Sequence, residues 1–464
     1  DVLVLIGLLA RARAIGTHPL DRTAYQSRYT TVRNARRWCW RGQTPHPSAP
    51  PGTVALAEQL SAGQRGTDAG THLDFRARLL ALGRPRLMRS SGAVVVRGPN
   101  AWESGLLPSP TVTDDVRRVA VWTTGNVSRQ AVRAILARPD LELVGAYAHS
   151  AEKAGADVGV LCGLDHELGV HATADVDELL ALGLDAIVYA PLHLDIDELE
   201  QLLGAGVNVV ASAEFMTGAT LPTARRGRLE AACTAGDATL FGSGMNPGYA
   251  QLLAAIGAGI TSGVERVVVS ESVDVSHYVT DANFASAGWA RPADDPGHAD
   301  DVRAGTQVFA EGLETLGRLL GITFDDMRCD VAFAHATQDL DVPELRIPAG
   351  HVAGMDVHWI GVVGGADVVE IRQRWLASEH IEPPWKVEHG YVVEVTGDPN
   401  VRLKMDIWPT ADDMAHLDKE TMHSIGMRIT AVPVVNAIPA VCAAPAGIAT
   451  YAELPVITSL LHPD

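Results

Sequence analysis

Apolar and polar residues follow two alternating patterns along the middle of the chain, beginning near residue 117. Apolar runs with strand character occur at 118–123, 141–147, 185–190, 207–212 and 238–243. Stretches with the period of an amphipathic helix lie between them, at 127–137, 175–182, 195–204 and 222–235. Strands that alternate with helices in this way predict a parallel sheet with helices on both faces. Ligands of such sheets bind beyond the carboxyl ends of the strands.

The pattern changes in the second half of the chain, where strands dominate. Strand-like runs occur at 264–275, 328–335, 352–363, 367–377, 388–396 and 400–407, and a single long helix is predicted over 301–320. We therefore expect an α+β domain with a mainly antiparallel or mixed sheet, which covers the binding crevice of the first domain. Sheets of this kind often pair across a two-fold axis, so we also expect a homodimer.

The turn after the first strand carries the clearest chemical signal. Compared with the dinucleotide fingerprint G-x-G-x-x-G, Thr123 replaces the first glycine and Ser128 the third, while Gly125 keeps the position where the backbone approaches a pyrophosphate. Because the turn joins a strand to a helix, we favour a dinucleotide site over a purely structural turn. The predicted contacts come from Thr123, Thr124, Gly125, Asn126 and Val127.

The end of the second strand bears on the choice of cofactor. An NAD-selective site usually has an acid there for the ribose hydroxyls, but the chain has His149 and Ser150, followed by Lys153. These side chains suit a 2′-phosphate, so we expect NADP, or dual use of NADP and NAD. A solvated loop is the alternative interpretation.

Later strand ends supply further candidates. Ala190 and Pro191 are placed to pass beside the ribose, and Asn246, in a Gly- and Pro-rich loop, is placed to bond the nicotinamide amide. Glu214 follows an apolar strand, where partial desolvation would raise its pKa toward that of a general base. A helix cap or a surface ion pair is the alternative for Glu214. Candidate pocket walls are Tyr249, His277 and Tyr278.

These signals define a domain organisation. We predict a Rossmann-type dinucleotide-binding domain over 115–245, an α+β substrate and dimerisation domain over 246–430, and a C-terminal segment over 431–464 that returns to the cofactor domain. Apolar residues flank Asn436 in that last segment, so its amide must find a partner, and we count Asn436 with the cofactor-contacting residues.

Residues 1–110 differ from the rest in composition. They hold 15 Arg, no Lys and 6 acids, a balance of +9, and their Pro-, Gly-, Ser- and Thr-rich stretches have no sustained period. We expect a disordered or non-native extension, with an arginine-rich arm for an acidic partner as the alternative.

The remaining 354 residues have a net charge of −28, so the whole chain has a net charge of −19. An acidic body of this size disfavours nucleic acid and anionic membranes as partners. No apolar run approaches the ~20 residues that span a bilayer. The five cysteines show neither metal spacing nor a disulfide framework, and no histidine pair has zinc-protease spacing. We therefore expect a cytoplasmic protein without a metal.

Several motifs together resemble one known family. The segments VWTTGNV (121–127), HSAEK (149–153), EF (214–215), GMNPG (244–248) and VNAIPA (435–440) resemble those of the native amine dehydrogenase and 2,4-diaminopentanoate dehydrogenase family, whose members have a dihydrodipicolinate reductase-like N-terminal domain. The resemblance covers about 115–458. It implies a Rossmann domain joined to an α+β domain, a dimer, hydride exchange between NAD(P) and an amine or imine, and Glu214 as the catalytic carboxylate.

The resemblance sets the expected function. We expect reductive amination of a small ketone or aldehyde with ammonia, or the reverse deamination. The alternatives are a dihydrodipicolinate reductase-like imine or carbonyl reductase acting on another metabolite, and a non-catalytic nucleotide-binding protein. True dihydrodipicolinate reductases carry a His-His-x-x-Lys stretch and a Ser-Gly-Thr loop, which this sequence lacks. The absence of lysine between Lys153 and Lys386 argues against a dicarboxylate substrate.

Overall fold

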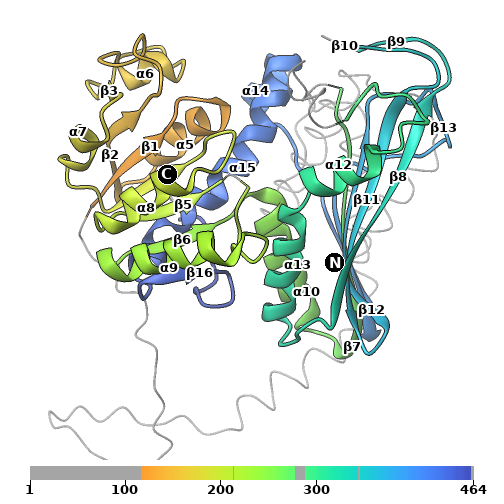
Figure 1. Cartoon of the computed structure of the whole chain (residues 1–464). Helices are drawn as coiled ribbons and strands as arrows, with labels where there is room; N and C mark the ends of the chain where they lie inside the picture. The colour runs from red at the N-terminus through yellow and green to blue at the C-terminus, as the bar shows by residue number, and fades with distance from the viewer. Residues whose placement is uncertain (1–115, 213, 277–287, 343–344, 461–464) are drawn as a thin grey trace, which may run out of the picture. The chain divides into compact units, whose positions relative to one another are not determined.

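The computed structural model describes residues 116–460, apart from 213, 277–287 and 343–344 (Figure 1). Our expectations for residues 1–110, and for His277 and Tyr278 as pocket walls, lie outside the described residues.

The first sheet has seven parallel strands in the order β16-β6-β5-β4-β1-β2-β3. Their bounds are β1 Arg117–Trp122, β2 Leu141–Tyr147, β3 Ala172–Thr173, β4 Ala186–Tyr189, β5 Asn208–Ala211, β6 Thr239–Gly242 and β16 Gly447–Ala449. Five of them match the predicted runs to within one residue at each end, because each is a short apolar segment buried on both faces. The predicted Rossmann-type sheet is confirmed.

Helices cover both faces of this sheet (Figure 1). Alternate residues of β1 point to opposite faces. Val119 and Val121 pack with α5 (Asn126–Leu136) and α15 (Lys419–Cys442), whereas Ala120 and Trp122 pack with the other face. That face carries α8 (Ile196–Gly204) and α9 (Thr223–Gly236). Two short helices, α6 (Val158–Leu161) and α7 (Val176–Leu180), flank β3.

Helix α15 runs parallel to α5 and is tied to it at three levels. The Asn126 amide lies 3.1 Å from His423 Nε2, Gln130 donates to Ser424 Oγ at 2.9 Å, and Arg138 donates to Asn436 Oδ1 at 3.0 Å. The residue numbers rise together in both helices, so both N-termini lie at the carboxyl edge of the sheet.

The length and hydropathy of α15 correct one sequence expectation. Residues Glu420–Cys442 are long and apolar enough to cross a membrane by composition alone, whereas we expected no run of that length. Within the described chain, 44% of its most apolar window is buried against the Rossmann domain and its neighbours.

The second sheet also has seven strands, in the order β13-β8-β11-β12-β7-β14-β15. All neighbours are antiparallel except β7 and β12, which makes the sheet mixed, as predicted. Its strands are β7 Ser262–Asp274, β8 Asp326–Ala336, β11 Val352–Val363, β12 Ala366–Leu376, β13 Ile381–Glu382, β14 Gly390–Asp398 and β15 Val401–Met405. A separate hairpin pairs β9 (Leu340–Val342) with β10 (Leu345–Ile347).

One face of this sheet forms the second core. Val267, Val269, Val357, Ile371 and Val393 point inward and pack with α10 (Ala250–Ala258) and α13 (Val308–Leu319). A short helix, α14 (Ala411–Ala415), leads into α15 and begins with a capping box between Thr410 and Asp413.

The long helix predicted over 301–320 is instead two helices, α12 (His298–Gly305) and α13. The break falls at Thr306, whose hydroxyl donates to the Val302 carbonyl at 2.8 Å and accepts from the Trp359 indole at 3.2 Å. The helical pattern of apolar residues alone did not predict this break, at which Thr306 is bonded to the second sheet through Trp359.

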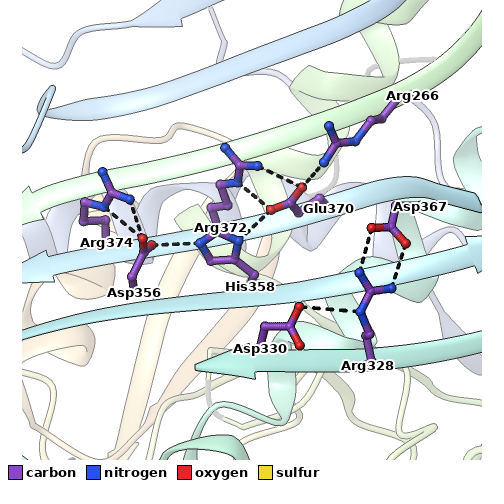
Figure 2. Close-up of polar contacts among 9 residues, drawn as sticks. All are labelled: Arg266, Arg328, Asp330, Asp356, His358, Asp367, Glu370, Arg372 and Arg374. Atoms are coloured by element: carbon purple, nitrogen blue, oxygen red, sulfur yellow. Dashed lines mark hydrogen bonds and ion pairs between the residues drawn. The ribbon is translucent and has the colours of Figure 1, made fainter. Parts of the chain in front are cut away.

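The opposite face of the second sheet carries a network of charges, hereafter the outer network (Figure 2). Glu370 contacts Arg266, Arg372 and His358, while Asp356 contacts His358 and Arg374. At the next strand, Arg328 forms a bidentate pair with Asp367, with both distances 2.7 Å. Each buried acid of the outer network therefore has at least two cationic partners.

Candidate functional site

The turn after β1 adopts a glycine-like conformation without a glycine. Thr123 has φ +84°, an outlier for a β-branched residue. Three contacts hold it there: its N–H donates to the Tyr147 carbonyl at 3.0 Å, its hydroxyl donates to the Ala190 carbonyl at 3.2 Å, and the Ser128 hydroxyl lies 3.1 Å away. The two residues that replace glycines of the fingerprint thus bond each other, and the backbone shape of the turn is kept.

The N-terminus of α5 fits an anionic ligand. No side chain caps the helix, and its first turn holds no acid. A Cβ added at Gly125 would meet nothing closer than the Thr123 hydroxyl at 3.8 Å, so neighbouring protein atoms do not require the glycine. Lys153 Nζ donates to Thr124 Oγ1 at 3.2 Å, which puts a cation beside the turn. Free N–H groups, an open approach and a nearby ammonium suit the pyrophosphate of a dinucleotide.

The other predicted cofactor contacts lie around this turn in different ways. Ala190 adjoins it through the bond from Thr123, and Pro191 follows. His149 Nε2 lies 3.8 Å from Glu198, and its ring stands edge-on to Tyr147. The Ser150 carbonyl accepts the Lys153 N–H at 2.9 Å and so orders that loop.

A cavity of about 280 Å³ opens where the carboxyl ends of β5 and β6 face the inner side of the second sheet. Ser212 follows β5, and the segment η1 (Met245–Tyr249), which is irregular at Asn246, Pro247 and Gly248, follows β6. The second domain contributes Glu271, Val308 and Tyr391, and α15 contributes Thr430. Polar groups from both domains therefore meet in one partly open hollow, the concave kind of surface that small-molecule sites use.

Glu271 is the acid of this cavity. Its Oε2 accepts from Asn246 Nδ2 at 2.7 Å, its Oε1 accepts from Trp375 Nε1 at 2.9 Å, and Tyr391 also donates to it. Burial raises the pKa of Glu271 and outweighs these three hydrogen bonds, which lower it. Raised carboxyl pKa values are characteristic of functional sites.

Glu214 occupies a more open position than we expected. Its side chain is 59% exposed, and its carboxylate lies 3.8 Å from His193 Nδ1. The expected partial desolvation is therefore not met in this structure, because Glu214 stands on the loop beyond β5 rather than in the cavity wall. Its catalytic role stays a prediction.

A second glutamate, Glu311 on α13, holds the loop that follows Glu214. Its carboxylate is 1% exposed and accepts the N–H groups of residues 216, 217, 218 and 220 at 2.8 to 3.0 Å. It also accepts the hydroxyl of Thr220. This anchor fixes the path of the chain just after Glu214 and ties the loop to the second domain.

Asn246 and Tyr249 make other contacts than the predicted ones. Asn246 donates to Glu271 and accepts from Gln251 at 3.0 Å, so both ends of its amide are used within the protein. Its bond to a nicotinamide stays a prediction. Tyr249 packs between the two domain cores and is not among the residues that line the cavity, so its predicted place in the pocket wall is not met.

Asn436 is a correction. Its amide does find a partner, as expected, but that partner is Arg138, beyond the C-terminal end of α5. Eleven helical residues separate this point from the phosphate turn, a distance of about 16 Å. Asn436 therefore bridges two helices at the far edge of the sheet.

Sequence reasoning missed Glu271, although a signal was present. Positions 267, 269 and 271 share one face of β7, so the alternation of Val267 and Val269 places Glu271 on the apolar side. A charged residue in phase with a buried face requires a partner or a function. Glu311 on α13 and Gln373 on β12 are also buried polar residues, and sequence reasoning missed them as well.

The architecture is shared with a protein of known structure. A parallel Rossmann-type sheet followed by a mixed α+β sheet is shared with a solved amine dehydrogenase from Mycobacterium smegmatis, with a TM-score of 0.60 at 23% identity. The match covers 74% of this chain and 97% of that chain, and at this identity it establishes the fold.

The sequence comparisons find similarity to the same family. Residues 252–463 match the model of the 2,4-diaminopentanoate dehydrogenase C-terminal domain. An amine dehydrogenase from Streptomyces virginiae is 31% identical over 217 residues, which are 45% of this chain and 60% of that protein. The chain thus spans about three fifths of this relative. The family resemblance inferred from the motifs is confirmed.

Proposed function

We propose that the protein is an NAD(P)-dependent oxidoreductase that aminates a small ketone or aldehyde with ammonia, or catalyses the reverse deamination. The observation that carries the proposal is the cavity, in which the carboxyl ends of β5 and β6 meet the polar part of the second sheet. The amine dehydrogenase relatives support the assignment of C–N chemistry.

The turn at residues 123–127 and the N-terminus of α5 would hold the cofactor phosphates, with Lys153 as the adjacent cation. When bound, the nicotinamide ring supplies or accepts the hydride. Because β2 ends without an acid and Lys153 stands beside the turn, we propose use of both NADP and NAD.

Glu214 would act on nitrogen protons. In the reductive direction its carboxylate takes a proton from ammonium, and the resulting ammonia adds to the substrate carbonyl. The carbinolamine gains a proton on oxygen and loses water, which leaves a protonated imine (an iminium ion) for reduction. A carboxylate performs these transfers efficiently when it is within hydrogen-bond reach of the reacting nitrogen and shielded from water. The Glu311 anchor fixes the loop just after Glu214 and would in this way help to position its carboxylate for the substrate.

The test is oxidation of NADH and of NADPH by the full chain with small ketones and aldehydes, each with and without ammonium. We expect turnover that depends on ammonium, and a loss of about 10²- to 10⁴-fold in kcat for Glu214→Gln. Glu167→Gln, an exposed glutamate elsewhere in the Rossmann domain, is the control and keeps full activity. Equal ketone reduction without ammonium would indicate a carbonyl reductase, and cofactor binding without any turnover would indicate a nucleotide-binding protein.

A homodimer also stays a proposal. Sedimentation of the full chain at several concentrations tests it, with a mass near twice 49.2 kDa as the expected result.

A further inference from the structure

A row of polar side chains crosses the largely apolar inner face of the second sheet. In the registered pairing, Gln373 of β12 lies opposite Glu271 of β7, which in turn lies opposite Tyr391 of β14. The neighbouring row, two residues away, is Ile371, Val269 and Val393. Directly opposite residues share a face and have Cβ atoms about 5 Å apart, so the polar row is contiguous.

Among the described residues, the groups that hydrogen-bond to Glu271 are neutral. Its three donors are an amide, an indole and a phenol, and no arginine, lysine or histidine within the described ranges forms an ion pair with it. When ionised, it is an anion at the wall of a cavity with its charge uncompensated by the described protein. Burial of such a charge is costly unless a cation joins it.

Gln373 is the second observation. Its side chain is fully buried, yet neither its Nε2 nor its Oε1 has a hydrogen-bond partner in the described part of the chain. Buried amides are almost always satisfied, so an orphan amide beside an unpaired acid needs a reason. Gln373 is not itself among the residues lining the cavity, but its registered neighbour Glu271 is.

We propose that Glu271, with Gln373 beside it, forms a subsite for an ammonium group inside the cavity. The inference rests on the proposed function only in taking the cavity as the substrate pocket. An ammonium has three N–H donors and one positive charge, which the Glu271 carboxylate at the cavity wall complements, with the Gln373 amide in the adjacent registered position. A substrate carboxylate is repelled. A metal ion is disfavoured, because among residues 116–460, outside the gaps given above, no group of three His, Cys, Asp or Glu is placed to hold one.

The ammonium has two possible sources that share this chemistry. One is the ammonium ion consumed in the proposed amination, and the other is a second amino group on the organic substrate. If the subsite takes the ammonium ion, Glu271→Gln raises the KM for ammonium with every ketone. If it takes a second amino group, Glu271→Gln removes a preference for amino ketones over simple ketones and leaves the KM for ammonium unchanged.

The direct test is calorimetric titration of the full chain with butylamine, 1,4-diaminobutane and, as the neutral comparison, butan-1-ol. We expect the amines to bind more tightly than the alcohol, and Glu271→Gln to weaken amine binding by about 10- to 100-fold without changing alcohol binding. Glu271→Asp keeps the charge and retains the amine preference. Gln373→Leu weakens amine binding less, by about 5-fold.

Glu265→Gln is the matched control, since Glu265 lies on the same strand with the same side-chain phase but is exposed. Equal amine affinity in the wild type and in a folded Glu271→Gln protein would overturn the proposal, and so would equal affinity of the wild type for butylamine and butan-1-ol. Binding requires no turnover. A retained amine preference without amination would therefore refute the proposed function and leave the subsite standing.

Discussion

The two faces of the second sheet handle buried carboxylates in opposite ways. On the outer network, Glu370 and Asp356 are each surrounded by arginine and histidine (Figure 2). On the inner face, Glu271 has an amide, an indole and a phenol as its partners. Strands β7 and β12 contribute residues to both sets. The sheet thus supplies cationic partners to the acids of its outer network, whereas the described residues supply none to Glu271 at the cavity.

The pKa values express this contrast. Burial raises the pKa of Glu370, but the hydrogen bonds of His358 and Arg372 outweigh it and lower the value to about 2. At Glu271 burial wins, and the pKa is raised. A paired acid contributes to the folded state, whereas an unpaired acid facing a cavity is available to a ligand.

The largest expected effect on stability comes from removing an acid of the outer network. Glu370→Gln leaves Arg266, Arg372 and His358 without their common anion, so we expect a loss of about 3 kcal/mol in the free energy of unfolding. Urea denaturation measures it. Glu394→Gln removes a half-exposed partner of Arg402 and should cost less than about 0.5 kcal/mol. Equal costs for the two variants would contradict the structural role of the outer network.

Glu311 tests whether neutral donors alone can hold a buried acid in place. Glu311→Gln presents an NH₂ group to a nest of backbone donors, so we expect a loss of about 2 kcal/mol in unfolding free energy and reduced turnover through the Glu214 loop. Glu314→Gln, one turn later, loses one bond to this loop and should cost less. Urea denaturation and steady-state kinetics measure both. Unchanged kcat in a folded Glu311→Gln protein would show that the anchor does not position Glu214.

His358 gives the outer network a pH dependence. Hydrogen bonds to Asp356 and Glu370 raise its pKa from 6.5 to about 9, so its stabilising contribution is complete below 6.5 and lost as pH rises through 9. Glu370 contributes fully above 4.5, and its contribution is lost as pH falls toward 2. The stability gap between the wild type and His358→Gln should be about 2 kcal/mol near pH 6 and shrink above pH 9. Unfolding curves across this range test the sign, and a gap that grows with pH would contradict it.

The smallest expected effect concerns Glu271, which has no cationic partner among the described residues. The raised pKa of Glu271 means that its contribution to stability is present below 4.5 and lost as pH rises through the folded-state value. Near pH 8, Glu271→Gln should therefore be as stable as the wild type, or more stable by up to about 1 kcal/mol. Thermal unfolding at pH 5 and pH 8 measures the change. A destabilisation comparable to that of Glu370→Gln would show that Glu271 serves the fold.

Local pattern was enough to predict most of the elements. Strands β1, β2, β4, β5 and β6 of the Rossmann sheet, together with β11, lie within a residue of the apolar runs, because each run is short, largely buried and bounded by turn residues. The two short strands β3 and β16 were not predicted. The contact of Thr306 with Trp359, at the break between α12 and α13, was not predictable from the local pattern because Trp359 is distant in the sequence. The partner of Asn436 and the exposure of Glu214 likewise depend on tertiary packing. The position of Glu271 on the apolar face of β7 could be predicted from the sequence. Its neutral partners could not, because they come from three other elements.

The last strand of the Rossmann sheet has a consequence for synthesis. β16 pairs with β6, yet about two hundred residues of the second domain are translated between them. Until the ribosome has released residues 447–449, the edge of β6 lacks its neighbour, and the face covered by α15 is bare. The nascent first domain thus presents an open sheet edge and apolar surface while the second domain is being translated, the condition under which chaperones are recruited.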